Sequence, residues 1–188
     1  MNRSFELFLI ILMGFFLLIP AIFIAILIKL DSRGPILYRS KRIGKGNDIF
    51  YMPKFRTMRS DTPQQATHLM GNPDDYLLSS GNFLRKYSLD ELPQIFSVIN
   101  GSMNFVGPRP ALYNQYDLIE IRDRKSIFEI KPGITGWAQV NGRNAISWEE
   151  KFNKDIWYVY NMNFILDLKI IFLTIWKVIK RDSINAVN

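Results

Sequence analysis

The sequence predicts an α+β fold that is mainly helical, and three features of the 188-residue chain support this prediction. A long uncharged segment stands near the N-terminus, two short strand-forming runs follow it, and apolar residues repeat with helical spacing near the C-terminus. These features predict an N-terminal membrane helix, a short β-hairpin and amphipathic helices that lie at a membrane interface. We expect residues 1–30 to form the membrane helix and residues 31–188 to form one further domain, since no linker or repeat divides them.

The first element is a hydrophobic helix that is long enough to enter a membrane. Leu7 to Ile28 is a run of 22 residues without a charge, and as a helix it would be roughly 33 Å long, about the thickness of a hydrocarbon core. The run is too long for the apolar part of a signal peptide, and no small-residue cleavage site follows it. Basic residues follow instead, which predicts that the next domain lies in the cytoplasm. These residues are Lys29, Arg33, Arg39, Lys41, Arg42 and Lys45.

A proline interrupts this hydrophobic run. Pro20 removes a backbone donor and crowds the preceding turn, so we expect the helix to break or kink near it. Gly14 is a second weak point. A helix broken at Pro20 can enter and leave the membrane on one side, whereas a kinked helix can cross it, and the residues alone are compatible with both.

Between the two ends, the chain alternates strand, loop and helix patterns. The β-prone runs 36–38 and 49–52 flank a polar, glycine-containing segment at 42–48, which predicts a hairpin. Residues 61–75 and 131–143 are predicted to be loops. Helical segments are expected at 89–99, 113–128, 148–160 and 164–181.

The last helix has an apolar stripe with Lys and Trp beside it, which is typical of a helix at a membrane interface. Packing of the same stripe on the domain core is an equally good interpretation.

Composition excludes several chemistries. The chain has no cysteine and one histidine, His68, in a predicted surface loop. Thiol nucleophiles, iron–sulfur clusters and multi-histidine metal sites are therefore excluded, and a Ser-His-Asp triad is disfavoured. The net charge is +7 and the pI about 9.6, which favours phosphate-bearing partners such as nucleic acid, anionic lipid or a nucleotide.

A pair of adjacent carboxylates, Asp90 and Glu91, is the first candidate for chemistry. Ser88 and Glu91 have the spacing of a capping box at a helix start, which would be a structural role. The pair can also divide a phosphoryl-transfer reaction, with one carboxylate attacking phosphorus and the other holding a divalent cation. Arg85 and Lys86 stand just upstream.

Several cations are placed to bind phosphate. Arg109 lies between two prolines, and this stiff backbone suits a guanidinium that must meet an anion, although a structural turn would look the same. Lys54 and Arg56 share one side if their run is a strand. Arg143 follows an Asn-Gly turn. Neither a P-loop nor a dinucleotide-binding glycine motif is present.

Four segments in this order resemble those of the bacterial sugar transferase family, the monotopic phosphoglycosyl transferases. The segments are Lys54–Met58, Ser88–Gln94, Phe105–Pro110 and Lys131–Arg143. The resemblance covers nearly the whole chain and indicates a minimal family member. Asn144 to Glu149 is most similar to the small undecaprenyl-phosphate diacetylbacillosamine-1-phosphate transferases.

The resemblance implies a reaction and its site. The family transfers a sugar 1-phosphate from a UDP-sugar to undecaprenyl phosphate, releasing UMP, through a covalent phosphosugar on an aspartate. By motif that aspartate is Asp90, and Glu91 would help to bind Mg²⁺. Substrate phosphates would meet Lys54, Arg56, Arg85, Arg109 and Arg143.

The resemblance also implies a place in the cell. The family uses a re-entrant membrane helix, which makes the N-terminal helix of this chain a re-entrant one. The protein would then contact membrane lipids at the bacterial inner membrane, with its catalytic domain on the cytoplasmic face. We expect no nucleic-acid partner, because the cations form no single patch interleaved with aromatic residues.

This chain departs from common family patterns at two positions. Ser102 stands where many relatives carry Asp, so no metal ligand is expected there. Ile19 stands where relatives often carry Ser before the helix-breaking proline.

Two alternative functions involve no catalysis. A membrane-anchored basic module would bind nucleic acid without catalysis, and its binding would weaken with salt. A scaffold of the same fold would not depend on Asp90.

Overall fold

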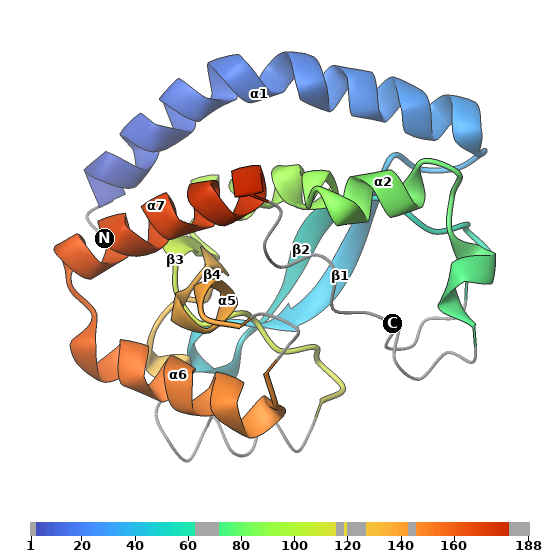
Figure 1. Ribbon diagram of the computed structural model, residues 1–188. Helices are drawn as coiled ribbons and strands as arrows, with labels where there is room; N and C mark the ends of the chain where they lie inside the picture. The colour runs from blue at the N-terminus through green and yellow to red at the C-terminus, as the bar shows by residue number, and fades with distance from the viewer. Residues whose placement is uncertain (1–2, 63–71, 116–118, 120–126, 143–145, 181–188) are drawn as a thin grey trace.

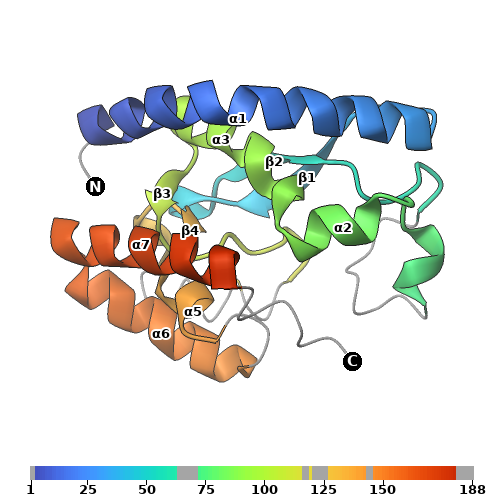
Figure 2. The ribbon, with the colours of Figure 1, turned by 45° about the horizontal axis from the view of Figure 1, so that its top comes forward.

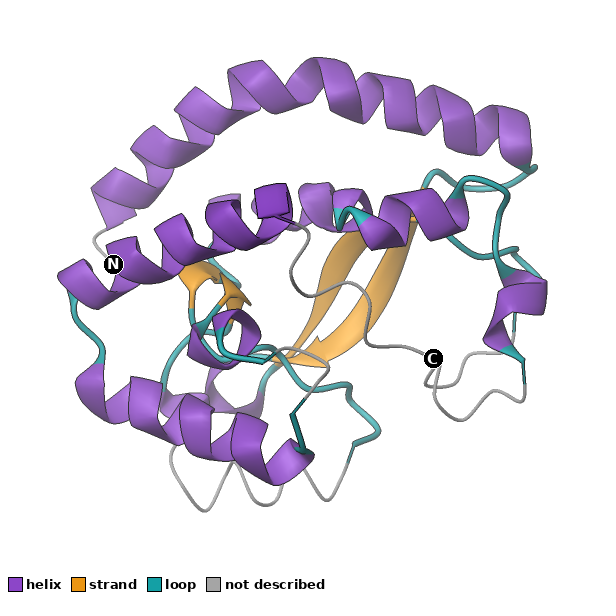
Figure 3. Cartoon of the chain, viewed as in Figure 1, coloured by secondary structure: helices purple, strands orange, loops and turns teal. Residues whose placement is uncertain are grey.

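The computed structural model describes residues 3–62, 72–115, 119, 127–142 and 146–180. The fold is mixed α/β and mainly helical, with a short antiparallel hairpin, as predicted (Figure 3). Helix α1 (Arg3–Asp31) runs along one edge, and α6 (Trp148–Asn161) lies at the opposite edge (Figures 1 and 2). Between these two edges lie the hairpin and helices α2 (Gly81–Lys86), α3 (Ile95–Ile99) and α7 (Phe164–Lys180).

Helix α1 is continuous through Pro20 but bent before it. Its two halves, Ser4–Leu12 and Phe16–Asp31, meet at 61°. The predicted break near Pro20 is therefore wrong in position. The ring of a proline inside a helix crowds the carbonyl four residues earlier, here that of Phe16, and Gly14 lies within the bend. Among the described residues no single helix is long and apolar enough to cross a membrane, although this bent pair meets the length and composition test jointly.

The helix rests on the domain near its two ends and arches away between them (Figure 1). Ile10 is buried in one core cluster, and Ile24 and Ile28 are buried in another. Between them the large apolar side chains are mostly exposed. The exposed large apolar side chains among the described ones of α1 are those of Leu7, Phe8, Ile11, Leu12, Phe16, Leu18, Ile19, Ile22, Phe23, Ile26 and Leu30.

The predicted hairpin is confirmed and is longer than expected. Strands β1 (Leu37–Ile43) and β2 (Ile49–Phe55) pair antiparallel, with Tyr38 opposite Lys54 and Arg42 opposite Phe50. A short 3-10 turn, Lys45–Asn47, joins the strands. Because side chains alternate along a strand and paired residues share a face, Arg42 and Lys54 lie on the same face of the hairpin.

A second, parallel pair of strands was not predicted. Strands β3 (Asn104–Val106) and β4 (Gly133–Thr135) pair where a loop was expected from residue 131. The amide of Gly107 donates to the carbonyl of Thr135 at 2.9 Å. A Cβ added at Gly133 would collide with the backbone nitrogen of Gly107, so glycine allows the two motif segments to meet backbone to backbone.

The helix expected at 89–99 is instead two shorter elements. Residues Leu89–Gln94 form a 3-10 helix and Ile95–Ile99 form α3. Pro93 lacks the amide proton that an α-helix would use at that position. Further short elements are the 3-10 helices Pro73–Tyr76 and Ile127–Glu129, and the α-helices α2 (Gly81–Lys86) and α5 (Trp137–Val140).

The two C-terminal helices are confirmed as α6 and α7 (Phe164–Lys180). Leu166 and Ile170 of α7 are buried in the core, while Phe172, Ile175 and Trp176 are exposed. Helix α7 thus packs on the domain and still presents an apolar face. The predicted helix at 113–128 lies largely outside the described residues, as does most of the 61–75 loop with His68.

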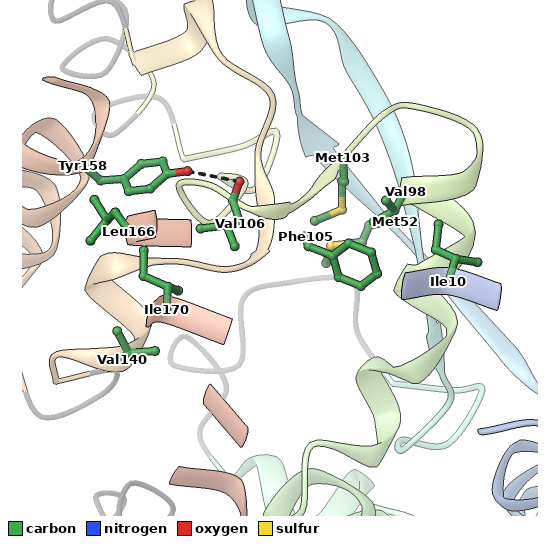
Figure 4. Packing of buried hydrophobic residues seen from close by; sticks show 10 residues of the cluster. All are labelled: Ile10, Met52, Val98, Met103, Phe105, Val106, Val140, Tyr158, Leu166 and Ile170. Carbon is green, nitrogen blue, oxygen red and sulfur yellow. Dashed lines mark hydrogen bonds between the residues drawn. The ribbon is translucent and has the colours of Figure 1, made fainter. Parts of the chain in front are cut away.

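The main core cluster joins α1, the hairpin and the C-terminal helices around β3 (Figure 4). The Tyr158 hydroxyl of α6 donates to the Asp167 carboxylate at 2.7 Å and lies 3.5 Å from the carbonyl of Val106. On the same strand, the Phe105 amide donates to the buried Glu6 carboxylate of α1 at 3.4 Å. Strand β3 therefore contacts the helices at both edges of the fold, α1 and α6.

Candidate active site

The carboxylate pair faces the end of strand β2. Asp90 and Glu91 lie in the first turn of the 3-10 helix Leu89–Gln94, and Asp90 is only 9% exposed. Lys54 Nζ donates to Glu91 Oε1 at 2.9 Å and lies 4.0 Å from Asp90 Oδ2. Lys54 precedes Asp90 and Glu91 by 36 positions or more in the sequence, and the three side chains form one cluster in the fold.

Arg109 completes this cluster from another segment. Its Nη2 donates to the same Glu91 oxygen, Oε1, at 2.7 Å. The Arg109 side chain is 40% exposed, whereas that of Glu91 is 16% exposed, so the guanidinium reaches from solvent onto the carboxylate. The proline-flanked arginine is thus part of the site rather than an isolated surface residue.

The two neighbouring carboxylates have opposite electrostatic surroundings. Burial raises the pKa of Asp90, and the positive charge of Lys54 only partly opposes this. Burial alone would raise the pKa of Glu91 too, but the charges and hydrogen bonds of Arg109 and Lys54 hold it well below its usual range. Glu91 is therefore a fixed anion, while Asp90 is the more basic of the two, and hence the better nucleophile once ionised.

The charge of Glu91 also affects the pKa values of the two neighbouring cations, Lys54 and Arg109. Burial lowers the pKa of Lys54, although Glu91 opposes the shift. The charge of Glu91 raises the pKa of Arg109. Both cations donate to one oxygen, Glu91 Oε1, so two positive charges meet at a single acceptor.

The expected capping box at Ser88 is wrong. Ser88 adopts a left-handed backbone conformation, φ 54°, and its side chain makes no capping hydrogen bond. The Glu91 side chain reaches Lys54 and Arg109 instead of the helix start. A capping box does occur at Ser147 and Glu150, at the start of α6.

The other predicted cations lie in different places. Arg85 donates through Nε to Thr57 Oγ1 at 2.9 Å, and it lies near enough to Asp90 to lower that carboxyl's pKa. Arg56 is buried and points elsewhere: its guanidinium donates to the carbonyls of Ser32 and Arg33 and to two serine hydroxyls. The prediction that Arg56 shares a side with Lys54 fails because β2 ends at Phe55. Arg143 lies outside the described residues.

One residue near the site was not identified from the sequence. Arg42, at the end of β1, lies close enough to Arg109 and Glu91 to feel both charges. The sequence placed it in a loop after residue 41. Counting alternate residues back from Lys54 across a symmetric hairpin would have put Arg42 on the same face.

The carboxylate pair fits one kind of metal site. In the described part of the chain, no group of three or more His, Cys, Asp or Glu side chains is placed to hold a metal ion. Magnesium, however, is commonly bound by one or two carboxylates together with substrate phosphates and water. Since Glu91 Oε1 already accepts two cations, the pair suits a Mg²⁺ that arrives with a diphosphate and does not suit a permanently bound ion.

With this fold and site in view, the chain belongs to the bacterial sugar transferase family, whose pattern matches residues 1–181. It is 42% identical over 168 residues to the uncharacterized sugar transferase EpsL of Bacillus subtilis, covering 89% of this chain and 81% of EpsL.

Two longer relatives carry functional names. The UDP-glucose:undecaprenyl-phosphate glucose-1-phosphate transferase of Xanthomonas campestris is 42% identical over 184 residues, which cover 92% of this chain and 37% of that enzyme. The UDP-N-acetylgalactosamine-undecaprenyl-phosphate N-acetylgalactosaminephosphotransferase of Aeromonas hydrophila is 37% identical over 159 residues, or 80% of this chain and 37% of that enzyme. The present chain therefore corresponds to little more than a third of these two proteins.

Proposed function

We propose that this protein transfers a sugar 1-phosphate from a UDP-sugar to undecaprenyl phosphate, giving a polyprenyl-diphosphate-linked sugar and UMP. The observation that carries the proposal is the buried Asp90 beside Glu91, Lys54 and Arg109. Family membership supports it, because named relatives act on undecaprenyl phosphate with glucose or N-acetylgalactosamine donors.

The proposed reaction has two displacements at one phosphorus atom. The ionised Asp90 oxygen attacks the phosphorus that carries the sugar, an Asp90–phosphorus bond forms, and the bond to the UMP oxygen breaks. UMP leaves with the bonding electron pair. A phosphate oxygen of undecaprenyl phosphate then attacks the same phosphorus, and the bond to Asp90 breaks, which restores the carboxylate.

The cations around Asp90 would neutralise the charge that phosphoryl transfer concentrates there. Lys54 lies 4.0 Å from Asp90, and the charges of Arg85 and Arg109 also act on this carboxyl. Glu91 holds Lys54 and Arg109 in position. Arg85 and Arg143 stay proposed phosphate contacts, whereas Arg56 is assigned a structural role because its Nη1 and Nη2 groups donate to acceptors within the fold. A Mg²⁺ held by Glu91 would reduce the charge repulsion between the diphosphate and the carboxylates.

We place the site at a membrane surface. The exposed apolar side chains of α1 and α7 are costly in water and suit the headgroup boundary of a bilayer. The bend in α1 supports a re-entrant path, with residues 31–188 on the cytoplasmic face of the bacterial inner membrane. This arrangement brings an aqueous nucleotide sugar and a lipid phosphate to the same carboxylate.

The decisive experiment measures UMP release. Purified protein in detergent would be given undecaprenyl phosphate, Mg²⁺ and one of a panel of donors: UDP-glucose, UDP-galactose, UDP-N-acetylgalactosamine and UDP-diacetylbacillosamine. We expect release with at least one donor, and a loss of more than a thousandfold in Asp90→Asn, because an amide cannot form the acyl phosphate. The covalent phosphosugar should appear by mass spectrometry when the acceptor is omitted.

Two results would contradict the proposal. Comparable turnover in Asp90→Asn would mean that Asp90 is not the nucleophile. Absence of both UMP release and the covalent adduct with every donor would favour a membrane-anchored basic binding module without catalysis.

A further inference from the structure

Two of the three guanidinium nitrogens of Arg42 are anchored to the protein. Nε donates to the buried Ser40 hydroxyl at 3.0 Å, and Nη1 donates to the carbonyl of Pro110 at 3.1 Å. The backbone beside it is also fixed, because the amide of Ile43 donates to the carbonyl of Ala111 at 3.0 Å. The end of β1 thus holds the segment that carries Arg109.

The third nitrogen, Nη2, has no protein partner within the described ranges. Nη2 of Arg42 makes no hydrogen bond to any described residue, and Arg42 forms no ion pair with a described carboxylate. A guanidinium has five donors in a planar fork that matches two phosphate oxygens. The two anchors hold the guanidinium in one orientation in advance and leave the two N–H groups of Nη2 to donate.

The charge of Arg42 is poorly compensated where it lies. Burial, and the nearby charge of Arg109, lower the pKa of Arg42 to about 10, so the group is still a cation at neutral pH. Both hydrogen-bond acceptors of Arg42 are neutral oxygens. The guanidinium groups of Arg42 and Arg109 lie close enough to feel each other's charge, and an anion bound beside Arg42 would relieve this repulsion.

We infer that Arg42 is a further substrate-phosphate ligand of this site: its Nη2 group takes a phosphate oxygen next to the phosphate held by Arg109. The inference rests on the proposed function for the identity of the substrate. The phosphate belongs either to the nucleotide sugar or to the lipid acceptor, which offer the same chemistry to a guanidinium.

The test compares Arg42→Gln and Arg42→Lys with the matched control Arg39→Gln. Arg39 lies on the same strand, exposed and on the opposite face of the hairpin. Steady-state rates would be measured at varied UDP-sugar and at varied undecaprenyl phosphate, after the thermal midpoints confirm folding. For Arg42→Gln we expect kcat/KM to fall by roughly ten- to a hundredfold. We expect Arg42→Lys to recover part of the loss, because it keeps the charge, and Arg39→Gln to match the wild type.

The pattern of the loss identifies the source of the phosphate. A fall confined to kcat/KM for the UDP-sugar, with weaker calorimetric binding of UDP, indicates the nucleotide. A fall confined to undecaprenyl phosphate indicates the lipid. Equal losses in the Lys and Gln variants would show that Arg42 only holds Pro110 and would overturn the inference, as would a loss no larger than that of Arg39→Gln.

Failure of the proposed function gives a different result. In that case the wild type releases no UMP with any donor. Calorimetric binding of UDP and of inorganic phosphate to wild type, Arg42→Gln and Arg39→Gln would then decide the inference: weaker binding in Arg42→Gln alone supports it, and equal binding in all three overturns it.

Discussion

At the scale of single residues, two carboxylates that are neighbours in sequence have different tasks because they have different neighbours in space. Glu91 is held as an anion by two cations on one oxygen. Asp90 is buried beside the same cations, but Lys54 Nζ lies 4.0 Å from its Oδ2, beyond hydrogen-bond distance. A carboxylate without a tight ion pair is the better nucleophile, because less attraction must be broken when it attacks.

This difference predicts a pH dependence. The pKa of Asp90 is raised above its usual 3.8 by burial, and only the ionised form attacks, so kcat/KM for the UDP-sugar should fall as the pH falls through that raised pKa. Lys54 lowers the pKa of Asp90, so Lys54→Met should move the acid limb to higher pH as well as reduce the rate. The measurement is the pH profile of kcat/KM, with Lys45→Met in the exposed hairpin turn as the control.

An acid limb in Lys54→Met that is unchanged, or displaced to lower pH, would contradict this account of Asp90. A displacement in the Lys45→Met control of the same size would mean that net charge, and not the local ion, sets the profile.

The sequence named Asp90, Glu91, Lys54 and Arg109 as site candidates, and the structure brings the four side chains together, but their contacts were assigned less well. The Ser88 to Glu91 spacing matches a capping box, yet the charged side chains of Lys54 and Arg109 offer Glu91 stronger partners than a backbone amide does. Arg56 was expected on the same side as Lys54 because the alternation of side chains along the strand was extended one residue beyond the end of β2. Both errors concern contacts between distant segments, which local spacing does not encode.

At the scale of elements, the patterns that were long and periodic were predicted well. The hairpin and helices α6 and α7 follow alternation and helical repeats in the sequence. Strands β3 and β4 have three residues each, too few to show alternation, and their pairing depends on a close approach at Gly107 and Gly133. Elements this short are defined by their partners, so the sequence predicted a loop there.

Arg56 joins the end of α1 to the end of β2, and this junction predicts a stability effect. The guanidinium donates to the carbonyls of Ser32 and Arg33 from a site that is 5% exposed. Arg56→Ala would leave these acceptors without their donor, so we expect a loss of about 2–4 kcal/mol in the free energy of unfolding. Denaturant titration in detergent measures it.

The matched control is Arg59→Ala, three residues later. Arg59 is exposed and pairs with Asp61 on the surface, so its removal should barely change the unfolding midpoint. Equal effects of the two substitutions would mean that Arg56 contributes only a surface charge and does not hold the junction.

At the scale of the whole molecule, α1 is fixed near both ends and exposes its apolar middle. Ile10 and Ile28 are buried, whereas most large side chains between them are exposed. The sequence predicted the apolar character of this helix and that a proline would disturb it. The bend, between Leu12 and Phe16, lies at the second weak point, Gly14, and not at Pro20, where the break was expected.

The arch predicts that both ends of α1 are on the same side of the membrane. The chain contains no cysteine, so Ser4→Cys and Arg33→Cys each create a unique label site. We expect a membrane-impermeant maleimide to label both in inside-out vesicles and neither in intact spheroplasts. Lys45→Cys, in the hairpin turn, marks the side on which the catalytic domain lies. Labelling of Ser4→Cys from the opposite side to Lys45→Cys would show that the helix crosses.

The contact between Glu6 and the Phe105 amide has a consequence for the order in which the chain is made. The two residues are 99 positions apart, and at about 5–20 residues per second a ribosome needs roughly 5–20 s to add the second after the first. During that interval the most apolar helix of the protein exists without the strand on which its buried carboxylate will dock. A bilayer or a chaperone must shield the apolar side chains of this helix during that time. The helix therefore meets its final environment before it packs on the rest of the domain.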